Sequence, residues 1–199
     1  MTARDAILGR LRDAPAGDVA AEARGLLTAP ERPVVPRDAL VETFVAQLDR
    51  PSVAATLDRI ATLSDLPDAM RRYLGDIDLY LPPDTRLAAL DWTGLARVAD
   101  CPIDGGAAVA IATAAVAETG TLVLDTAPAA PMLPNFLALH HIVVVPREAL
   151  VAQLEDVPLP VAWPRARYWI TGVSGTTDIE GHYVRGAHGP RFLHVILLG

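Results

Sequence analysis

The apolar run Ile-Val-Val-Val at residues 142–145 constrains the fold more than any other feature of this chain. β-Branched side chains favour strands, and this run contains no polar residue. A strand that faces water on one side alternates apolar and polar residues, whereas a strand covered on both faces is apolar throughout. The run therefore predicts a largely parallel sheet that is buried between two outer layers.

Candidate strands and helices alternate along most of the chain, and together they predict an α/β three-layer sandwich with a largely parallel sheet. The clearest helix runs from Arg37 to Leu48, where apolar residues recur at the spacing of one buried helical face. The other helices are expected from about residue 64 and near 131–139, 147–154 and 176–181. Strands are expected at 53–57, 77–81, 107–112, 121–125, 141–145, 167–171 and 192–198.

The N-terminal region differs in composition from the rest of the 199-residue chain. Ile7, Leu8 and Leu11 predict a short helix. Residues 13–36 contain four prolines and two glycines and little periodic pattern, which is typical of a surface linker or a partly disordered arm. We therefore divide the chain into an N-terminal helix and proline-rich arm, residues 1–36, and one α/β domain, residues 37–199.

The charged residues exclude several classes of function. The net charge of −7 argues against a nucleic-acid partner, because phosphate binding needs a concentrated basic surface. All seventeen basic residues are arginine, so the lysines of pyridoxal enzymes and of P-loop nucleotidases are missing. No GxGxxG occurs, and the stretch Gly-Val-Ser-Gly-Thr at 172–176 departs from a hydrolase nucleophile elbow, because Thr176 replaces the second glycine.

Cys101 is the only cysteine, so the chain has no internal disulfide and no set of thiolates for zinc or an iron–sulfur cluster. His182, His188 and His194 are six residues apart and share no helical face, so no metal site is expected. The first ten residues carry charges and lack the apolar core of a signal peptide. The longest nearly apolar run, 107–117, is too short for a membrane span of about 20 residues, which predicts a soluble, cytoplasmic protein.

Two segments near the C-terminus combine turn residues with charged or hydroxyl side chains. Thr176 and Thr177 precede the acidic Asp178 and Glu180, a composition typical of a helix start, which is also a site for anions. On one interpretation these residues only cap the helix. On the other they form part of a binding site.

The second of these segments is a turn. Gly186 and Gly189 predict that Arg185 and His188 lie on a loop that leads into the last strand. Turn formation alone would explain the glycines. The clustering of acidic and basic side chains within a dozen positions favours a site.

The segment Ala-Glu-Thr-Gly-Thr at 117–121 is a third candidate. Gly120, between Thr119 and Thr121, suggests a tight turn whose backbone N–H groups point at an anionic or carbonyl ligand. Glu118 is the only acid in a weakly polar stretch, so we expect it to be partly buried, as a general base often is. The alternative is that Glu118 caps a turn or pairs with an arginine.

Residues 117–124, 176–181 and 184–190, with the following apolar run 192–198, together resemble the lactate utilization protein C group of the LUD-domain family. The resemblance covers most of the chain and is strongest from about residue 107. It implies the fold seen in ribose-5-phosphate isomerases, glucosamine-6-phosphate deaminases and coenzyme A transferases. It also implies a role in oxidising L-lactate to pyruvate, together with partner proteins that carry iron–sulfur clusters, whereas this chain binds no cofactor.

The leading hypothesis is a subunit of an L-lactate utilization system that binds a small anion in a pocket at strand ends. Arg185 would pair with a carboxylate, Gly120 and the Thr176 helix start would supply backbone donors, and Glu118 or His188 would move a proton. The first alternative is a stand-alone enzyme acting on a sugar phosphate or an acyl-coenzyme A. The second is a non-catalytic structural subunit that assembles through its proline-rich arm.

Overall fold

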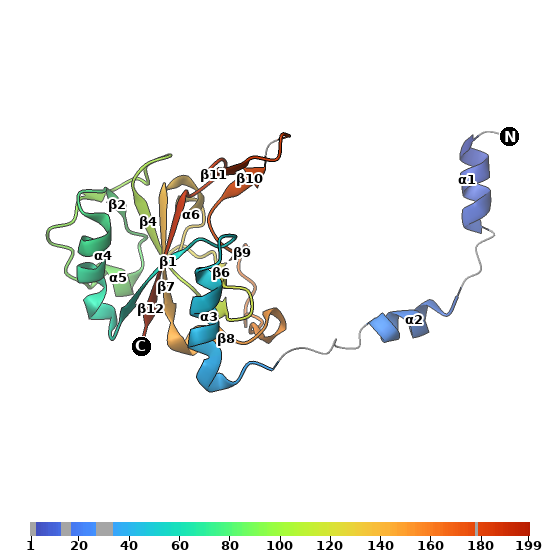
Figure 1. Ribbon diagram of the computed structural model, residues 1–199, viewed down its shortest axis with the longest axis horizontal. Coiled ribbons are helices and arrows are strands. Elements are labelled where there is room, and N and C mark those ends of the chain that lie inside the picture. Colours follow the sequence, from blue (N-terminus) through green and yellow to red (C-terminus); the bar gives the residue numbers. More distant parts are fainter. Residues whose placement is uncertain (1–2, 13–16, 27–33, 178) are drawn as a thin grey trace. The chain divides into compact units, whose positions relative to one another are not determined.

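The computed structural model describes residues 3–12, 17–26, 34–177 and 179–199. Its contacts divide the chain into two compact units, Met1–Val34 and Val35–Gly199. In the first unit the described residues form the helices α1 (Ala3–Arg12) and α2 (Val19–Leu26) (Figure 1). The helix α2, which has no buried residue, lies inside the segment 13–36, where no helix was predicted.

The second unit is built around a six-stranded sheet in which every neighbouring pair of strands is parallel. The strand β7 contains the run 142–145, and all four of these residues are completely buried. The prediction of a mostly parallel sheet covered on both faces is therefore confirmed. The strands in spatial order are β1 (Thr56–Ile60), β12 (Phe192–Leu198), β7 (His140–Pro146), β4 (Ala107–Ile111), β2 (Leu79–Tyr80) and β3 (Arg97–Val98).

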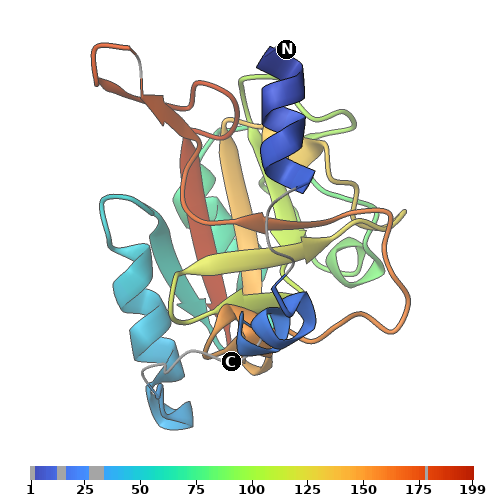
Figure 2. The same cartoon turned by 90° about the vertical axis from the view of Figure 1, so that its right-hand side faces the viewer.

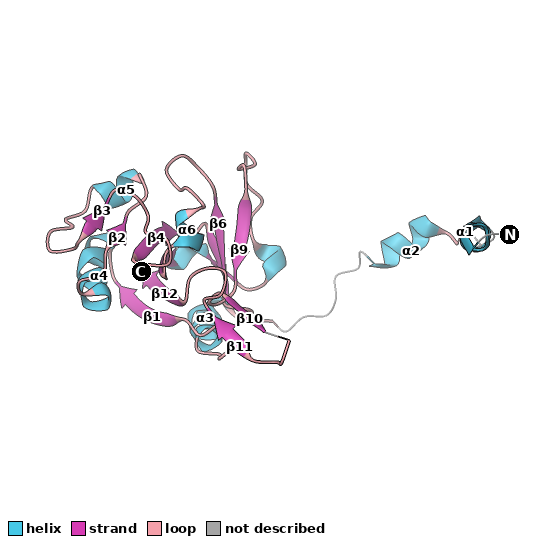
Figure 3. Ribbon diagram, turned by 90° about the horizontal axis from the view of Figure 1, so that it is seen from above, coloured by secondary structure: helices cyan, strands magenta, loops and turns pink. Residues whose placement is uncertain are grey.

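Alternate residues of β7 face two separate apolar cores. Ile142 and Val144 pack with the helices α4 (Leu66–Leu74) and α5 (Thr85–Ala88). Val143 and Val145 pack on the other face, with the helix α3 (Leu40–Leu48) and a second, smaller sheet. Figure 3 shows α4 and α5 on one side of the parallel strands and the smaller sheet on the other. The fold is thus a layered α/β structure.

The second sheet contains two of the strands that were expected in the parallel sheet, 121–125 and 167–171. Its strands run across β7 and β12 in Figure 2. Only two residues separate β4 from the next strand, and only four separate that strand from 121–125, whereas a parallel crossover needs a dozen or more. The chain must therefore turn back on itself. The strands in order are β8 (Leu150–Val151), β5 (Ala114–Val116), β6 (Thr121–Asp125) and β9 (Arg167–Ile170), with β6 antiparallel to both of its neighbours.

Several predicted helices are shorter than expected. The helix near 131–139 is a single turn, α6 (Pro134–Leu137), because Ala138 is extended. The helix predicted over 147–154 is instead two 3₁₀ turns with the strand β8 between them. The helix α4 begins after another 3₁₀ turn, in which Thr62 and Asp65 are joined by hydrogen bonds. The 3₁₀ turns are η1 (Arg37–Ala39), η2 (Leu63–Asp65), η3 (Arg147–Ala149) and η4 (Leu154–Asp156).

The helix predicted over 176–181 is wrong. The residues Gly175–Thr177 form the strand β10, which pairs antiparallel with β11 (Tyr183–Arg185). β-Branched threonines favour a strand, and Gly181, with a φ of 85°, lies in the turn that connects the two strands. Thr176 and Thr177 therefore do not cap a helix, and Asp178 lies outside the described residues.

Phe44 of α3 is fully buried against the parallel sheet, so its substitution tests this layer. Phe44→Ala should lower the free energy of unfolding by about 3 to 5 kcal/mol, because it removes a buried ring and leaves a cavity. Glu42→Ala, on the exposed face of the same helix, is the control and should change stability by less than about 0.5 kcal/mol. Urea unfolding would measure both. Equal stability of the two variants would contradict this packing.

Candidate functional site

A cavity of about 230 Å³ lies where β7 and β12 begin, at the amino ends of the parallel strands. It is enclosed by α6, by β9 and the loop that follows it, and by the loop that leads into β12. Its lining combines four polar side chains with an apolar wall. The polar residues are Asn135, His141, Ser174 and His188; the others are Phe136, Trp169, Ile170, Gly172, Val173, Gly189, Pro190 and Leu193.

His141 is the most buried polar group of the cavity, with 1% of its surface exposed. Its Nε2 atom has no hydrogen-bond partner among the described residues. Burial lowers the pKa of His141 to about 3, so the ring is neutral at physiological pH. A buried polar atom without a partner is costly and uncommon, and this nitrogen is itself covered, so it offers no surface to a molecule in the cavity.

The neighbouring His140 lies on the opposite face of β7, as expected for consecutive residues of a strand. Its Nδ1 lies 3.1 Å from the hydroxyl of Tyr73 on α4. It also stacks against Phe192, with ring centroids 4.5 Å apart. Only one histidine of the pair therefore lines the cavity.

Two aromatic side chains in the wall of the cavity remain partly exposed. Trp169 on β9 keeps 44% of its surface accessible, and Phe136 on α6 keeps 39%. Large aromatic groups are normally covered in a folded domain, so half-exposed rings beside a cavity offer contact area to a ligand. Among the residues that the structure describes, no arginine, aspartate or glutamate lines the cavity.

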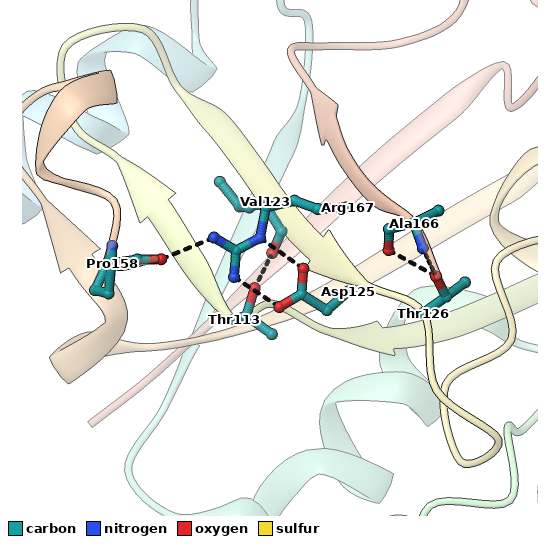
Figure 4. A network of polar contacts seen from close by, with 7 residues as sticks. All are labelled: Thr113, Val123, Asp125, Thr126, Pro158, Ala166 and Arg167. Carbon is teal, nitrogen blue, oxygen red and sulfur yellow. Dashed lines mark hydrogen bonds and ion pairs between the residues drawn. The ribbon is translucent and has the colours of Figure 1, made fainter. Parts of the chain in front are cut away.

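The position of Trp169 depends on an ion pair at the start of β9 (Figure 4). Arg167 donates two hydrogen bonds of 2.7 Å to the carboxylate of Asp125 on β6, and a third of 2.7 Å to the Pro158 carbonyl. Next to it, Thr126 and Ala166 exchange hydrogen bonds between side chain and backbone. A bidentate pair fixes orientation as well as distance, so it sets how β9 lies on β6.

The loop after β9 forms another part of the cavity wall, and its path depends on Gly172, which has a φ of 87°. A Cβ at this position would lie 2.7 Å from the Cα and carbonyl oxygen of Val53. The next amide, of Val173, donates to the same Val53 carbonyl at 3.0 Å. Only glycine allows the two backbones to approach this closely.

The LUD domain family matches residues 106–198. A lactate utilization protein C from Deinococcus radiodurans is 33% identical over an alignment of 152 residues that covers 68% of this chain and 70% of that protein. The chain belongs to the LUD-domain family, in the lactate utilization protein C group. A second protein of that name, from an Exiguobacterium species, is 29% identical over 98 residues, 45% of this chain and 43% of that protein.

A solved structure supports the fold of this LUD-domain protein. The crystal structure of a DUF162 family protein from Deinococcus radiodurans superposes with a TM-score of 0.56 and 20% sequence identity. The match covers 83% of this chain and all of that one. The likeness to isomerases, deaminases and coenzyme A transferases stays a prediction.

The C-terminal residues predicted for the site are spread over several places in the LUD domain. His188 and Gly189 line the cavity. Thr176, Thr177 and Arg185 lie in the hairpin of β10 and β11, and Glu180 lies exposed near its tip, within 3.8 Å of His182. The N–H of Gly186 donates to the Ser174 carbonyl at 2.8 Å, so this glycine closes the turn rather than offering a donor.

The segment 118–121 connects β5 to β6 and is not at the cavity. Glu118 is exposed, so the prediction of a partly buried general base is wrong. The N–H of Gly120 already donates to the Val116 carbonyl at 2.9 Å, so it is no free donor for an anion. Thr121 lies 2.6 Å from both Thr119 and Thr171, in a chain of hydroxyls across β6 and β9.

The histidines also separate in space. His194 faces α4, where Tyr73 stacks on it with centroids 3.8 Å apart, whereas His188 lies at the cavity on the other face of the sheet. The Nδ1 of His194 contacts the Thr56 hydroxyl at 2.7 Å, but its buried Nε2 has no hydrogen bond, so this core histidine is only partly satisfied. In the described part of the chain, no three potential ligands gather as they would around a metal ion.

The carboxyl end of β7 opens onto a wider groove of about 640 Å³. Arg37 and Arg147 line it, and neither guanidinium forms an ion pair with another described residue. Glu148 and Asp156 lie in the same groove.

None of the helices in the described ranges combines the length and apolar character that a bilayer crossing requires.

The sequence did not single out Asn135, Trp169 or Ser174 as members of a site. Asn135 is 4% exposed, and its amide donates to the Tyr168 hydroxyl at 2.6 Å. Nothing in the local sequence indicates that a polar residue next to Pro134 is buried. Ser174 was considered only as a nucleophile, whereas its role here is to line the cavity beside Gly189.

The lowered pKa values of the buried histidines predict a pH-dependent stability. His141 titrates near 3 and His194 near 4 in the folded protein, against an ordinary value of 6.5. Below pH 6.5 the unfolded chain therefore binds protons that the folded one does not, so stability falls as the pH falls. Each histidine contributes a slope of about 1.4 kcal/mol per pH unit in this range.

His141→Phe should therefore make the loss of stability between neutral and mildly acidic pH less steep than in the wild type. Urea unfolding at a series of pH values would measure the slopes. Val161→Ala is the control, since Val161 is exposed and carries no titrating group, so its substitution should leave the slope unchanged. An unchanged slope in His141→Phe would mean that His141 is protonated in the folded protein.

Proposed function

We propose that this LUD-domain protein takes part in the utilization of L-lactate, as a subunit that works with iron–sulfur proteins in the oxidation of lactate to pyruvate. The observation that carries the proposal is the 33% identity with a lactate utilization protein C over most of both chains. Two-electron oxidation of lactate requires a redox centre to receive the electrons. With a single cysteine, this chain has too few thiolates for a cluster, so the clusters would lie on its partners.

A small anionic ligand is part of this proposal, and it needs a cationic partner when it is withdrawn from water. No arginine of the described ranges lines the cavity at the amino end of β7. The groove at the carboxyl end of the same strand offers Arg37 and Arg147, and ligands of open α/β sheets bind at the carboxyl ends of strands. The groove therefore supports an anion site better than Arg185, which lies in the exposed β10–β11 hairpin.

Deletion of the gene should abolish growth on L-lactate and leave growth on pyruvate intact, because the block lies before pyruvate. Complementation with the wild-type protein should restore growth. Arg147→Gln should lower lactate-dependent dye reduction in cell extracts about tenfold, the usual effect of losing a charge-assisted hydrogen bond. Growth curves and dye reduction at matched expression levels would measure these effects.

Arg97→Gln is the matched control. Arg97 is exposed on β3, the edge strand of the sheet, and the strands β4 and β2 separate it from β7, whose carboxyl end opens onto the groove. It should behave as the wild type. Normal growth of the deletion strain on L-lactate would contradict the proposed function. Full activity of Arg147→Gln in a strain that needs this protein would refute the anion site while leaving the role in lactate utilization intact.

A further inference from the structure

The strand β9 leaves one of its two edges unpaired. It is the last strand of the smaller sheet and pairs with β6 alone. Directly before β9, the N–H of Thr126 donates to the Ala166 carbonyl at 2.9 Å. Hydrogen bonding alternates along an antiparallel pair, so the backbone of Tyr168 also faces β6, and the N–H and C=O of Trp169 point away from it. No strand satisfies these two groups, which makes this edge a template for one more strand.

The free edge borders the cavity at the amino ends of β7 and β12. Trp169 and Ile170 both line that cavity. Consecutive strand residues point to opposite faces of a sheet, so a cavity that both of them line must lie beside the strand. Since β6 occupies one edge of β9, the cavity lies along the other. A chain that paired with the free edge would therefore run past the cavity and place a side chain in it.

Apolar surface accompanies the unpaired backbone groups. Solvent-facing edges are usually protected by charged residues or proline, whereas the third residue of this strand is Trp169, which is 44% exposed. Phe136 of α6, in the same cavity, is 39% exposed. Aromatic side chains are enriched at protein interfaces, because they bury a large area. The volume of about 230 Å³ is below the roughly 300 to 1,000 Å³ of drug-sized ligand sites, which favours a bulky side chain over a cofactor.

The charges at one end of the cavity are basic, although the whole chain carries a net charge of −7. Arg191 follows Pro190, which lines the cavity. A Cβ on Gly186 would lie 2.8 Å from the Cβ of Arg191, so Arg191 packs against the turn that follows Arg185. Both arginines are exposed, and neither forms an ion pair with another described residue. An acidic group on a partner would complement them.

We infer that β9 pairs along its free edge with one extended segment of a partner protein, apolar at its centre and acidic at its ends. Main-chain hydrogen bonds to Trp169 supply affinity, and the cavity, which receives an apolar side chain, supplies selectivity. The helix α6 and the loop with Pro190 also enclose this cavity, so the space suits a single chain better than the sheet of a second copy. This site is separate from the groove at the carboxyl end of β7, and it does not depend on the proposed role in lactate utilization.

Three synthetic peptides test the backbone pairing and the charge. The first is fluorescein-labelled Glu-Val-Thr-Leu-Thr-Val-Glu, the second has lysine in place of both glutamates, and the third is the first with its three central amides N-methylated. Fluorescence anisotropy with the purified full-length protein would measure their binding. The glutamate peptide should bind with a Kd below about 1 mM. The lysine peptide should bind several-fold more weakly, and the methylated one at least about tenfold more weakly, because it lacks the donors of a strand ladder.

Variants of the protein test the position of the peptide. Trp169→Ala should weaken binding of the glutamate peptide about tenfold, whereas Trp163→Ala should bind as the wild type does, since Trp163 is 72% exposed and outside the cavity. Arg191→Gln should reduce the preference for glutamate over lysine. The matched control is Arg59→Gln, because Arg59 is exposed on β1 of the other sheet.

Four outcomes would overturn the inference. They are no binding of the glutamate peptide up to 1 mM (roughly), equal binding of the methylated peptide, equal or tighter binding of the lysine peptide, and unchanged binding by Trp169→Ala. Sedimentation of the same proteins would examine the alternative occupant. A wild-type dimer that Trp169→Ala dissociates, without peptide binding, would assign the edge to a second copy and refute the partner segment.

Discussion

The strand β7 imposes the constraint on which the rest of the domain depends. It is paired with β12 on one side and β4 on the other, and its central residues are completely buried on both faces. Its backbone groups are therefore satisfied only by neighbours, and its side chains are covered only if both outer layers are present. The pairing of β7 with β12 and β4 also fixes the backbone position of the two histidines at its start.

The sequence predicted those parts of the fold that rest on local pattern. The apolar run 142–145 indicated a covered parallel strand, and the spacing of Leu40 to Leu48 indicated a helix with one buried face; both are present. The second sheet was missed, because apolar strands of similar composition occur in both sheets and only the short connections distinguish them. Thr176 was misplaced because hydroxyl residues suit both a helix start and a β-strand, and pairing with the 183–185 segment favoured the strand.

The candidate site was predictable only in part, because it depends on contacts between distant segments. The loop with His188 and Gly189 was recognised from its glycines, and it does line the cavity. The burial of His141 follows from its position on β7 beneath residues of β9 and α6, which no local pattern reveals. Glu118 seemed a candidate because its neighbours are apolar. Those neighbours are buried strand residues, whereas the turn that carries the carboxylate is exposed.

The stacking of Tyr73 on His194 joins α4 to β12 of the parallel sheet. The two rings are almost parallel, with an interplanar angle of 10°. An aromatic ring shields protons that lie above its face from an applied magnetic field. The ring protons of His194 should therefore resonate upfield of their usual position whenever α4 is packed on the sheet. Their chemical shift would report directly whether this helical layer is in contact with the sheet.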